Sequence, residues 1–265
     1  MKLNSTIALV TGASSGIGAA TAKAMAKKGA RVALLARTES ALKNVAAEIA
    51  AGGGEAKVYP VDLTDSTRVE RTIDRLKFEM GEVDVVVNSA GAGRWLFTEE
   101  TSPAEAADMM AVPYFAAFYV TRFCLPSMLE RRRGHIVNVN SPVVRSAWPG
   151  AAGYTAARYA LLGFTNALRF DLRGTGVNVT SIVPGKVADS EYFQRNKGVE
   201  ERIPAIGKII PTVTSAQVAK ATVQGVEQNK REVVLPFMLK VFFAANHFFP
   251  WPMEWLLAAT GWQRR

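Results

Sequence analysis

The feature that most constrains the fold is a regular alternation of short apolar segments with longer amphipathic ones. The apolar segments, which we predict to be β-strands, are 6–11, 31–36, 56–61, 83–88, 134–140, 177–183 and 232–235. The segments predicted to be helices, from their spacing of alanine, leucine and charge, are 16–28, 40–51, 66–80, 113–132, 154–173 and 215–228. Such alternation indicates a parallel sheet joined by right-handed crossovers. We therefore predict an α/β fold over residues 1–235: a single doubly wound domain of about seven strands, with helices on both faces.

A glycine-rich turn, residues 11–18, directly follows the first predicted strand and opens the first predicted helix. Glycines there let the backbone turn tightly and approach a phosphate without a Cβ in the way. The free N–H groups and the positive dipole end of the helix face the same phosphate. In this strand–turn–helix setting the motif predicts a Rossmann-like dinucleotide site, the alternative being a turn that holds no ligand. The predicted contacts from this turn are Gly12, Ser14, Ser15, Gly16, Ile17 and Gly18.

Arg37 indicates which dinucleotide the chain binds. It stands at the end of the second predicted strand, where an acid favours NAD and an arginine can hold the 2′-phosphate of NADP. The nearest acid, Glu39, lies too far along the chain to act as the ribose carboxylate. The alternative for Arg37 is a solvated arginine at a strand end. An acid at the end of the third strand is placed to accept from the adenine amino group. The side chains predicted to hold the adenosine end are Arg37, Thr38, Asp62 and Leu63.

Three further motifs follow in order along the chain. The turn 88–91 reads Asn-Ser-Ala-Gly, Ser141 precedes Tyr154 by thirteen residues, and Pro184 and Gly185 follow the sixth predicted strand. Together with the glycine turn they resemble a short-chain dehydrogenase/reductase over about residues 5–235. The resemblance implies an oxidoreductase that moves hydride between a nicotinamide, here of NADP(H), and a carbonyl or hydroxyl carbon.

In that family a serine polarises the substrate carbonyl and a tyrosine gives or takes the proton, roles that the resemblance assigns to Ser141 and Tyr154. A free tyrosine has a pKa of about 10, so a fixed cation one helical turn away is needed to favour the phenolate. In the family that cation is a lysine, which also binds the nicotinamide ribose. Here it is Arg158, four residues after Tyr154 and so on the same helix face. The further cofactor contacts that the resemblance implies are Asn88, Ala90, Gly91, Tyr154, Arg158, Pro184, Gly185 and Val187.

The chain departs from the family pattern in four places. Arg158 replaces the lysine, and Pro113 stands where the family has a relay asparagine. Ser89 replaces the second asparagine of its turn, and Asp189, with Ser190 beside it, replaces a threonine. Arginine keeps the charge but does not release a proton, and proline lacks a side-chain donor and would kink or start a helix. We predict that the tyrosine remains the acid/base, tuned by Arg158 with water replacing the relay. The alternative is a weak or inactive NADPH-binding sensor or partner protein.

The segment 186–214 occupies the place of the family's substrate lid. Its side chains and others near the site are mostly apolar, which favours a hydrophobic ketone or alcohol that is lipid-like, steroid-like or polyketide-like. The alternative is that its isoleucines are ordinary lid packing. Gly198 and Gly207 are candidate flex points. The predicted lining is Tyr192, Phe193, Ile203, Ile206, Ile209, Ile210, Arg94, Trp95, Leu96, Phe97, Val143, Val144 and Trp148.

The last segment, 236–265, is an aromatic-rich C-terminal extension that is either part of the same domain or peripheral to it. Lys240, Glu254 and two prolines interrupt it, so no stretch of about 18 apolar residues exists to span a membrane. Three alternatives stay open: it packs on the core, it packs on a partner subunit, or residues 236–262 lie in a bilayer interface.

Charge, cysteine and histidine content exclude other classes. The net charge is +9, but no aromatics are interleaved with the basic residues as nucleic-acid binding requires. A polyanionic cofactor or an anionic membrane surface accounts for the charge equally well. The single Cys124 and the lack of a predicted secretory signal indicate the cytoplasm, with a peripheral place at a membrane surface as an option. His135 and His247 lie far apart, so no metal site is predicted. The resemblance implies a homodimer or homotetramer through helices 113–132 and 154–173.

Overall fold

The computed structural model describes residues 1–265 except 92, 191, 193–195, 197–198 and 262–265. Its centre is a seven-stranded sheet in the order β3-β2-β1-β4-β5-β6-β7, in which every neighbouring pair is parallel. The strands are β1 (Ile7–Thr11), β2 (Arg31–Ala36), β3 (Glu55–Pro60), β4 (Val85–Asn88), β5 (Gly134–Val139), β6 (Val177–Pro184) and β7 (Glu232–Leu235). The predicted doubly wound fold is confirmed, and each strand begins and ends within two residues of its predicted range.

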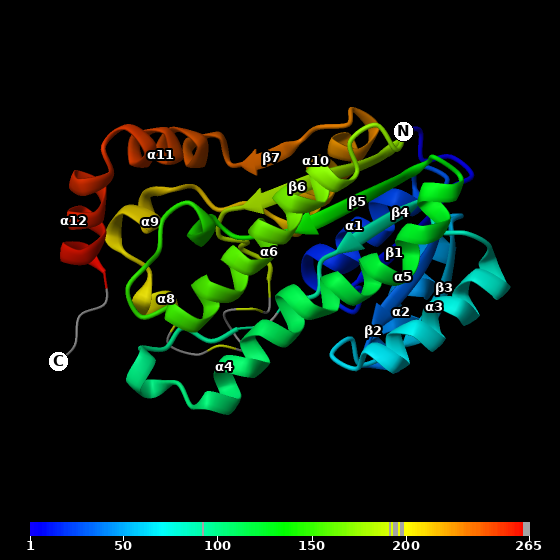
Figure 1. The fold of residues 1–265 in the computed structure, drawn as a ribbon, viewed down its shortest axis with the longest axis horizontal. Coiled ribbons are helices and arrows are strands. Elements are labelled where there is room, and N and C mark those ends of the chain that lie inside the picture. The colour runs from blue at the N-terminus through cyan, green and yellow to red at the C-terminus, as the bar shows by residue number, and fades with distance from the viewer. Residues whose placement is uncertain (92, 191, 193–195, 197–198, 262–265) are drawn as a thin grey trace.

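Helices cover both faces of the sheet (Figure 1). One layer holds α1 (Gly16–Ala26), α2 (Glu39–Ala51) and α10 (Ser215–Glu227). The other holds α3 (Ser66–Met80), α5 (Ala116–Glu130) and α6 (Ala152–Asp171). Shorter elements lie near the carboxyl ends of the strands, and they are η1 (Thr98–Glu100), α4 (Pro103–Met110), η3 (Pro142–Val144), α8 (Val199–Arg202) and α9 (Ala205–Ile209).

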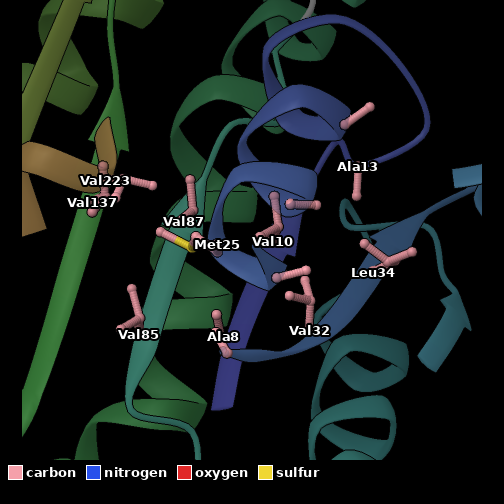
Figure 2. Close-up of a cluster of buried hydrophobic side chains, with 14 of the residues drawn as sticks. Ala8, Val10, Ala13, Met25, Val32, Leu34, Val85, Val87, Val137 and Val223 are labelled. Atoms are coloured by element: carbon pink, nitrogen blue, oxygen red, sulfur yellow. The ribbon is translucent and has the colours of Figure 1, made fainter. Parts of the chain in front are cut away.

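The strands read as apolar throughout because each central strand is buried on both faces. Along β1, Ala8 and Val10 face the layer of α1 and α10, whereas Leu9 faces the layer of α3 and α5. Figure 2 shows the first of these cores, in which Met25 of α1 and Val223 of α10 meet the side chains of the central strands. Burying one such aliphatic side chain stabilises a fold by about 1.5–3 kcal/mol. The two cores therefore hold the sheet between its helix layers.

The helix predicted at 113–132 begins earlier than expected. Ser102 caps α4, its hydroxyl accepting from the Glu105 N–H, and the chain continues through a π-helical turn (η2, Ala111–Phe115) into α5. Pro113 lies inside that turn and so interrupts a longer helix instead of starting one. The longer π-turn accommodates a ring that has no N–H to donate. The capping pattern Ser-Pro-x-Glu at 102–105 was the sequence signal for the true start.

The aromatic C-terminal segment forms two helices, α11 (Phe237–Phe248) and α12 (Pro250–Thr260). In the part of the chain that the structure describes, no helix is long and apolar enough to cross a membrane. The inner sides of α11 and α12 pack on the rest of the chain, through the cluster of Val183, Ile210, Leu239, Phe242 and Leu257. Packing on the core thus accounts for the inner faces of these helices, but not for their outer faces.

The single cysteine is a core residue. Cys124 on α5 is fully buried in the layer between the sheet and α3. Burial raises the pKa of its thiol to about 12, so it stays protonated and unreactive at neutral pH.

His135 on β5 is a buried histidine that stays neutral. Its Nε2 lies 2.8 Å from the Thr180 hydroxyl, which itself donates to the carbonyl of Lys230. Thr180 therefore accepts from His135, which places the imidazole proton on Nε2. Burial lowers the pKa of His135 from its ordinary 6.5 to about 4, because the charged form would lose its hydration.

This shift predicts an acid-sensitive fold. Between pH 6.5 and 4 the unfolded chain binds a proton at His135 that the folded chain does not, so stability is full above pH 6.5 and falls as pH drops towards 4. The loss expected from this one group is about 3 kcal/mol. Urea unfolding between pH 4 and 8 measures it. His135→Gln keeps a donor towards Thr180 but does not titrate. It should reduce the slope of the unfolding free energy against pH by the amount that corresponds to about one bound proton. An unchanged slope in the variant would contradict this assignment.

Candidate active site

One large cavity, of about 640 Å³, opens at the carboxyl ends of the strands. Its wall is made by the turns that follow β1 to β6, the place where ligands bind in doubly wound sheets. Of the predicted site residues, those that line it are Gly12, Ser14, Ser15, Gly16, Ile17, Gly18, Arg37, Thr38, Asp62, Leu63, Ala90, Gly91, Ser141, Tyr154, Arg158, Pro184, Gly185 and Val187. The chain thus brings together in one cavity segments that lie far apart in sequence.

Asn88 is the predicted cofactor contact that does not line this cavity. Its Nδ2 donates to Thr121 Oγ1 at 3.2 Å and to Asn138 Oδ1 at 2.8 Å. Asn138 in turn donates to Thr165 Oγ1 at 2.8 Å. This buried network joins β4 and β5 to α5 and α6. The side-chain amide of Asn88 therefore lies in the core behind the turn, and a contact of Asn88 with the cofactor stays a prediction.

The glycine turn has the shape of a phosphate cradle. Gly12 has a φ of +64°, and a Cβ there would come within 2.9 Å of the Ala90 backbone. A Cβ on Gly18 would overlap the carbonyl oxygen of Gly12. A Cβ on Gly16, by contrast, would meet only Ser190 Oγ at 4.0 Å and would occupy open space at the start of α1. The residues present therefore fit a dinucleotide phosphate held at this helix N-terminus.

Arg37 and Asp62 lie together at the adenosine end of the cavity. Arg37 is exposed and directly follows β2, and no acid stands at its position. Asp62 accepts from the backbone N–H and the hydroxyl of Thr64, and these bonds lower the pKa of the Asp62 carboxyl, with a smaller contribution from Arg37. The wall here presents the positive side chain of Arg37 beside a carboxylate that already accepts two hydrogen bonds.

Ser141, Tyr154 and Arg158 are all buried in the same wall. Their exposed fractions are 8%, 6% and 7%. Ser141 directly follows Asn140 at the end of β5, and its N–H donates to Asn140 Oδ1 at 3.0 Å. Tyr154 and Arg158 share one face of the first half of α6. The spacing read from the sequence thus brings these three side chains into one wall of the cavity.

The arginine contacts the face of the tyrosine ring. The guanidinium carbon of Arg158 lies 5.2 Å from the centroid of the Tyr154 ring, and Nη1 donates to the Val139 carbonyl at 3.0 Å. A Cβ on Gly91 would come within 2.6 Å of Nη2, so a larger residue at 91 would require the end of this side chain to move. The cation is therefore held next to the phenol in a cation–π geometry.

Among the described residues, several buried donors beside the cavity make no hydrogen bond to protein, and two of them belong to Asn140 and Arg158. Arg158 Nε and Asn140 Nδ2 are buried and make no hydrogen bond within the described part of the chain. Leaving such a group unpaired costs about 1–3 kcal/mol. Both residues line the cavity, so these donors fit a polar ligand such as ribose hydroxyls. Asn140 was missed in the sequence, although its place at the carboxyl end of a strand was the available signal.

Aromatic side chains make the other wall. Tyr154 packs at 6.1 Å from Trp95 and 6.2 Å from Tyr192, and Trp95 meets Trp148 edge to face at 5.5 Å. Tyr192 Oη donates to the Gly93 carbonyl at 3.0 Å. Burial raises the pKa of Tyr192, with a smaller contribution from Tyr154, so Tyr192 stays a neutral phenol. A substrate here would lie between rings and next to one buried tyrosine hydroxyl.

The predicted substrate lining is partly right. The predicted lining residues that do line the cavity are Trp95, Val143, Trp148, Tyr192, Ile203 and Ile210, and Gly207, predicted as a flex point, lines it as well. The predicted residues that do not line it are Arg94, Leu96, Phe97 and Val144. The prediction that Ile209 lines the site was wrong, because Ile209 ends a short helix and is 71% exposed. Phe193, Gly198 and the side chain of Ile206 lie outside the described residues. Val112 and Leu239 are among the lining residues that were not predicted.

The structure also shows the surroundings of Asp189, Ser190 and Pro113, the other residues at which the chain departs from the family pattern. Asp189 Oδ1 accepts from the Ser215 N–H at 2.7 Å and so holds the start of α10, whereas its neighbour Ser190 lines the cavity. Pro113 is buried in the π-turn beside Val112. Among the described residues, no group of histidine, cysteine and acidic side chains could hold a metal ion.

Comparison with known proteins agrees with this geometry. A profile of the family described as short chain dehydrogenase matches residues 6–199. Ketoacyl reductase HetN of Nostoc sp. is 32% identical over 227 residues, which is 86% of this chain and 77% of that protein. A metagenomic short-chain oxidoreductase solved in complex with NADP has a TM-score of 0.74 at 30% identity, over 88% of this chain and 97% of that one. A short chain dehydrogenase/reductase from Burkholderia phymatum solved with NAD has a TM-score of 0.81 over 94% and 95% of the chains; at 22% identity it shows likeness of fold alone.

Proposed function

Because this chain belongs to the short-chain dehydrogenase family, we propose that it is an NADP(H)-dependent oxidoreductase acting on a carbonyl or secondary alcohol of a hydrophobic substrate. The observation that carries the proposal is that the glycine cradle and the Ser141–Tyr154 wall face the same cavity. Arg37 at the end of β2 favours the phosphorylated dinucleotide.

In the proposed mechanism the protein positions the substrate oxygen and handles its proton. The cofactor, when bound, supplies or accepts the hydride. Ser141 donates a hydrogen bond to the oxygen that gains charge, and Tyr154 gives it the proton in the direction of reduction. Arg158, 5.2 Å from the ring centroid, stabilises the phenolate that remains. Its unpaired Nε and the Asn140 amide would hold polar groups of the cofactor.

The aromatic wall supports a hydrophobic substrate. Trp95, Trp148 and Tyr192 surround the Tyr154 ring, and Ile203 and Ile210 extend the apolar lining. An apolar pocket with a few convergent polar groups orients a large apolar substrate through one oxygen. Lipid-like, steroid-like and polyketide-like ketones are the classes that we propose to test.

Arg37 should decide between the two dinucleotides. Arg37→Ser is expected to weaken NADPH binding by about 10- to 100-fold and to leave NADH binding unchanged, because charge-assisted bonds to the 2′-phosphate are lost. Titration calorimetry with each cofactor measures this. Arg68→Ser is the matched control, since Arg68 is an exposed arginine near Asp62 that does not line the cavity. Equal losses for both cofactors would contradict the assignment.

A second candidate function is an NADPH-binding sensor or partner protein with little hydride transfer. It is favoured by the site itself: the arginine donates to Val139, and Pro113 offers no polar side chain to a relay.

Turnover by Arg158 variants distinguishes the two candidate functions. We expect the wild type to consume NADPH with hydrophobic ketones, and Arg158→Lys to stay within about tenfold of the wild-type rate, because both side chains supply the cation. Arg158→Met should lose far more. Turnover by the lysine variant alone would instead identify a silenced reductase.

We also propose a homodimer or homotetramer. The helices implied by the resemblance carry an aromatic cluster on their outer sides, formed by Tyr114, Phe115, Phe118, Tyr119 and Phe164. Phe115 and Phe118 are 40% and 39% exposed, as the rim of a helix–helix interface would be in a separated subunit. Light scattering of the purified protein tests the expected mass.

A further inference from the structure

The outer sides of α11 and α12 form an exposed aromatic surface, which we call the α11–α12 face. It is made by Phe237, Val241, Phe248, Phe249, Trp251 and Trp255. Trp251 is 83% exposed and Trp255 is 71% exposed. Single exposed apolar side chains are ordinary on proteins, but several large exposed aromatics on two helices that contact each other indicate a surface that meets another apolar phase.

Both helices are apolar on two sides. In α11, Phe237, Val241 and Phe248 repeat at helical spacing on the outer side, whereas Leu239 and Phe242 are buried inside. In α12, Trp251 and Trp255 lie one turn apart on the outer side, opposite the buried Leu257. A helix that only covers a core has a polar outer side. The outer stripes therefore need a second apolar environment.

The charges around this face indicate which environment it is. Lys240 lies on α11, and Glu254 is the single acid of the two helices. Lys208 on the adjacent α9 adds an exposed positive charge. The whole chain carries +9. A second copy docked on this face would bring like charges together, whereas an anionic lipid surface complements them.

We propose that the α11–α12 face binds the headgroup boundary of a bilayer that contains anionic lipid. Tryptophan and phenylalanine with flanking lysine suit that boundary, because the rings contact the acyl chains while the polar atoms stay hydrated. Figure 1 shows α11 and α12 together at one end of the molecule, α12 turned across the end of α11 and away from α5. The two helices lie in the plane of the membrane, their outer stripes inserted by about 5–10 Å.

This placement also concerns the cavity. Leu239, on the inner side of α11, lines it, so one helix separates the cavity from the proposed membrane face. On the assumption of the proposed function, a hydrophobic substrate dissolved in the bilayer would enter from this side. The bilayer contact itself does not depend on that assumption.

The test uses the full chain and vesicles in a flotation assay. We expect the wild type to float with vesicles of phosphatidylcholine and phosphatidylglycerol, less with phosphatidylcholine alone, and its tryptophan emission to shift to shorter wavelength. Trp251→Ala combined with Trp255→Ala should lower the vesicle partition coefficient by about tenfold or more. Phe78→Ala is the matched control, because Phe78 is 93% exposed on α3, outside this face, and its loss should change nothing.

Three outcomes would overturn the proposal: a wild type that stays with the soluble fraction, a double variant that floats as the wild type does, or a double variant whose mass without lipid falls. The last would identify an interface between copies. NADPH titration on the same samples separates the two proposals. Binding of NADPH without flotation removes the membrane contact alone, and flotation without turnover on any ketone counts against the proposed function alone.

Discussion

Tyr154→Phe is expected to lower turnover by about 10²- to 10⁴-fold, the contribution usual for a general acid or base. The variant keeps the ring between Trp95 and Tyr192 and the contact with Arg158, so packing and cofactor affinity should hardly change. Only the proton donor is lost. Steady-state NADPH consumption with the best ketone, together with NADPH titration, measures both quantities.

The matched control for that experiment is Tyr159→Phe. Tyr159 lies on the same helix but is 44% exposed and does not line the cavity. It should keep the wild-type rate. If Tyr154→Phe retained most of its turnover, Tyr154 would not be the acid/base and the proposed mechanism would fail. If it lost NADPH binding as well, the hydroxyl would be a cofactor contact, and the loss of turnover would not by itself identify the proton donor.

Gly18→Ala should have the second large effect, on both the fold and the cofactor site. The new Cβ would overlap the carbonyl oxygen of Gly12, and because the obstacle is backbone, α1 or the glycine turn must move. Overpacking of this kind costs about 1–3 kcal/mol, which lowers the Tm of a chain of this size by roughly 3–10 °C. NADPH affinity should fall by about tenfold or more, because the displaced turn no longer presents its N–H groups to the phosphates.

Gly163→Ala is the control for glycine removal. Gly163 lies inside α6, and a Cβ there would meet nothing within 4 Å. Alanine should stabilise the helix by about 0.5–1 kcal/mol and leave NADPH binding alone. Thermal unfolding with and without NADPH measures both variants. A Gly18→Ala protein that matched Gly163→Ala in Tm and affinity would show that the turn is not a cradle.

Local physical constraints explain why so much could be predicted. A strand buried on both faces must be apolar at every position, as Val85–Asn88 nearly is, so the strands of this sheet could be read directly. The glycine turn was recognisable because only residues without a Cβ fit where the backbones of Gly12 and Ala90 approach each other. The four-residue spacing of Tyr154 and Arg158 is likewise a property of one helix.

Other features depend on contacts between segments far apart in the chain. Asn88 follows a strand end like its neighbours in the turn, yet Thr121 and Asn138 hold its amide in the core. Arg158 could have faced the phenol oxygen, but the Val139 carbonyl and the space beside Gly91 direct it to the ring face.

The sequence by itself determined which segments form the strands of the sheet, which turns follow them along the chain, and which residue types stand in those turns. These features follow from burial, helical period and backbone sterics over a few residues. Only the tertiary structure decided which side chains line the cavity, with Ser190 in place of Asp189 and Leu239 arriving from α11. It also decided that α11 and α12 keep aromatic side chains on the outside. The reason is that the orientation and exposure of a side chain depend on its contacts with residues far away in the sequence. A local sequence pattern does not contain that information.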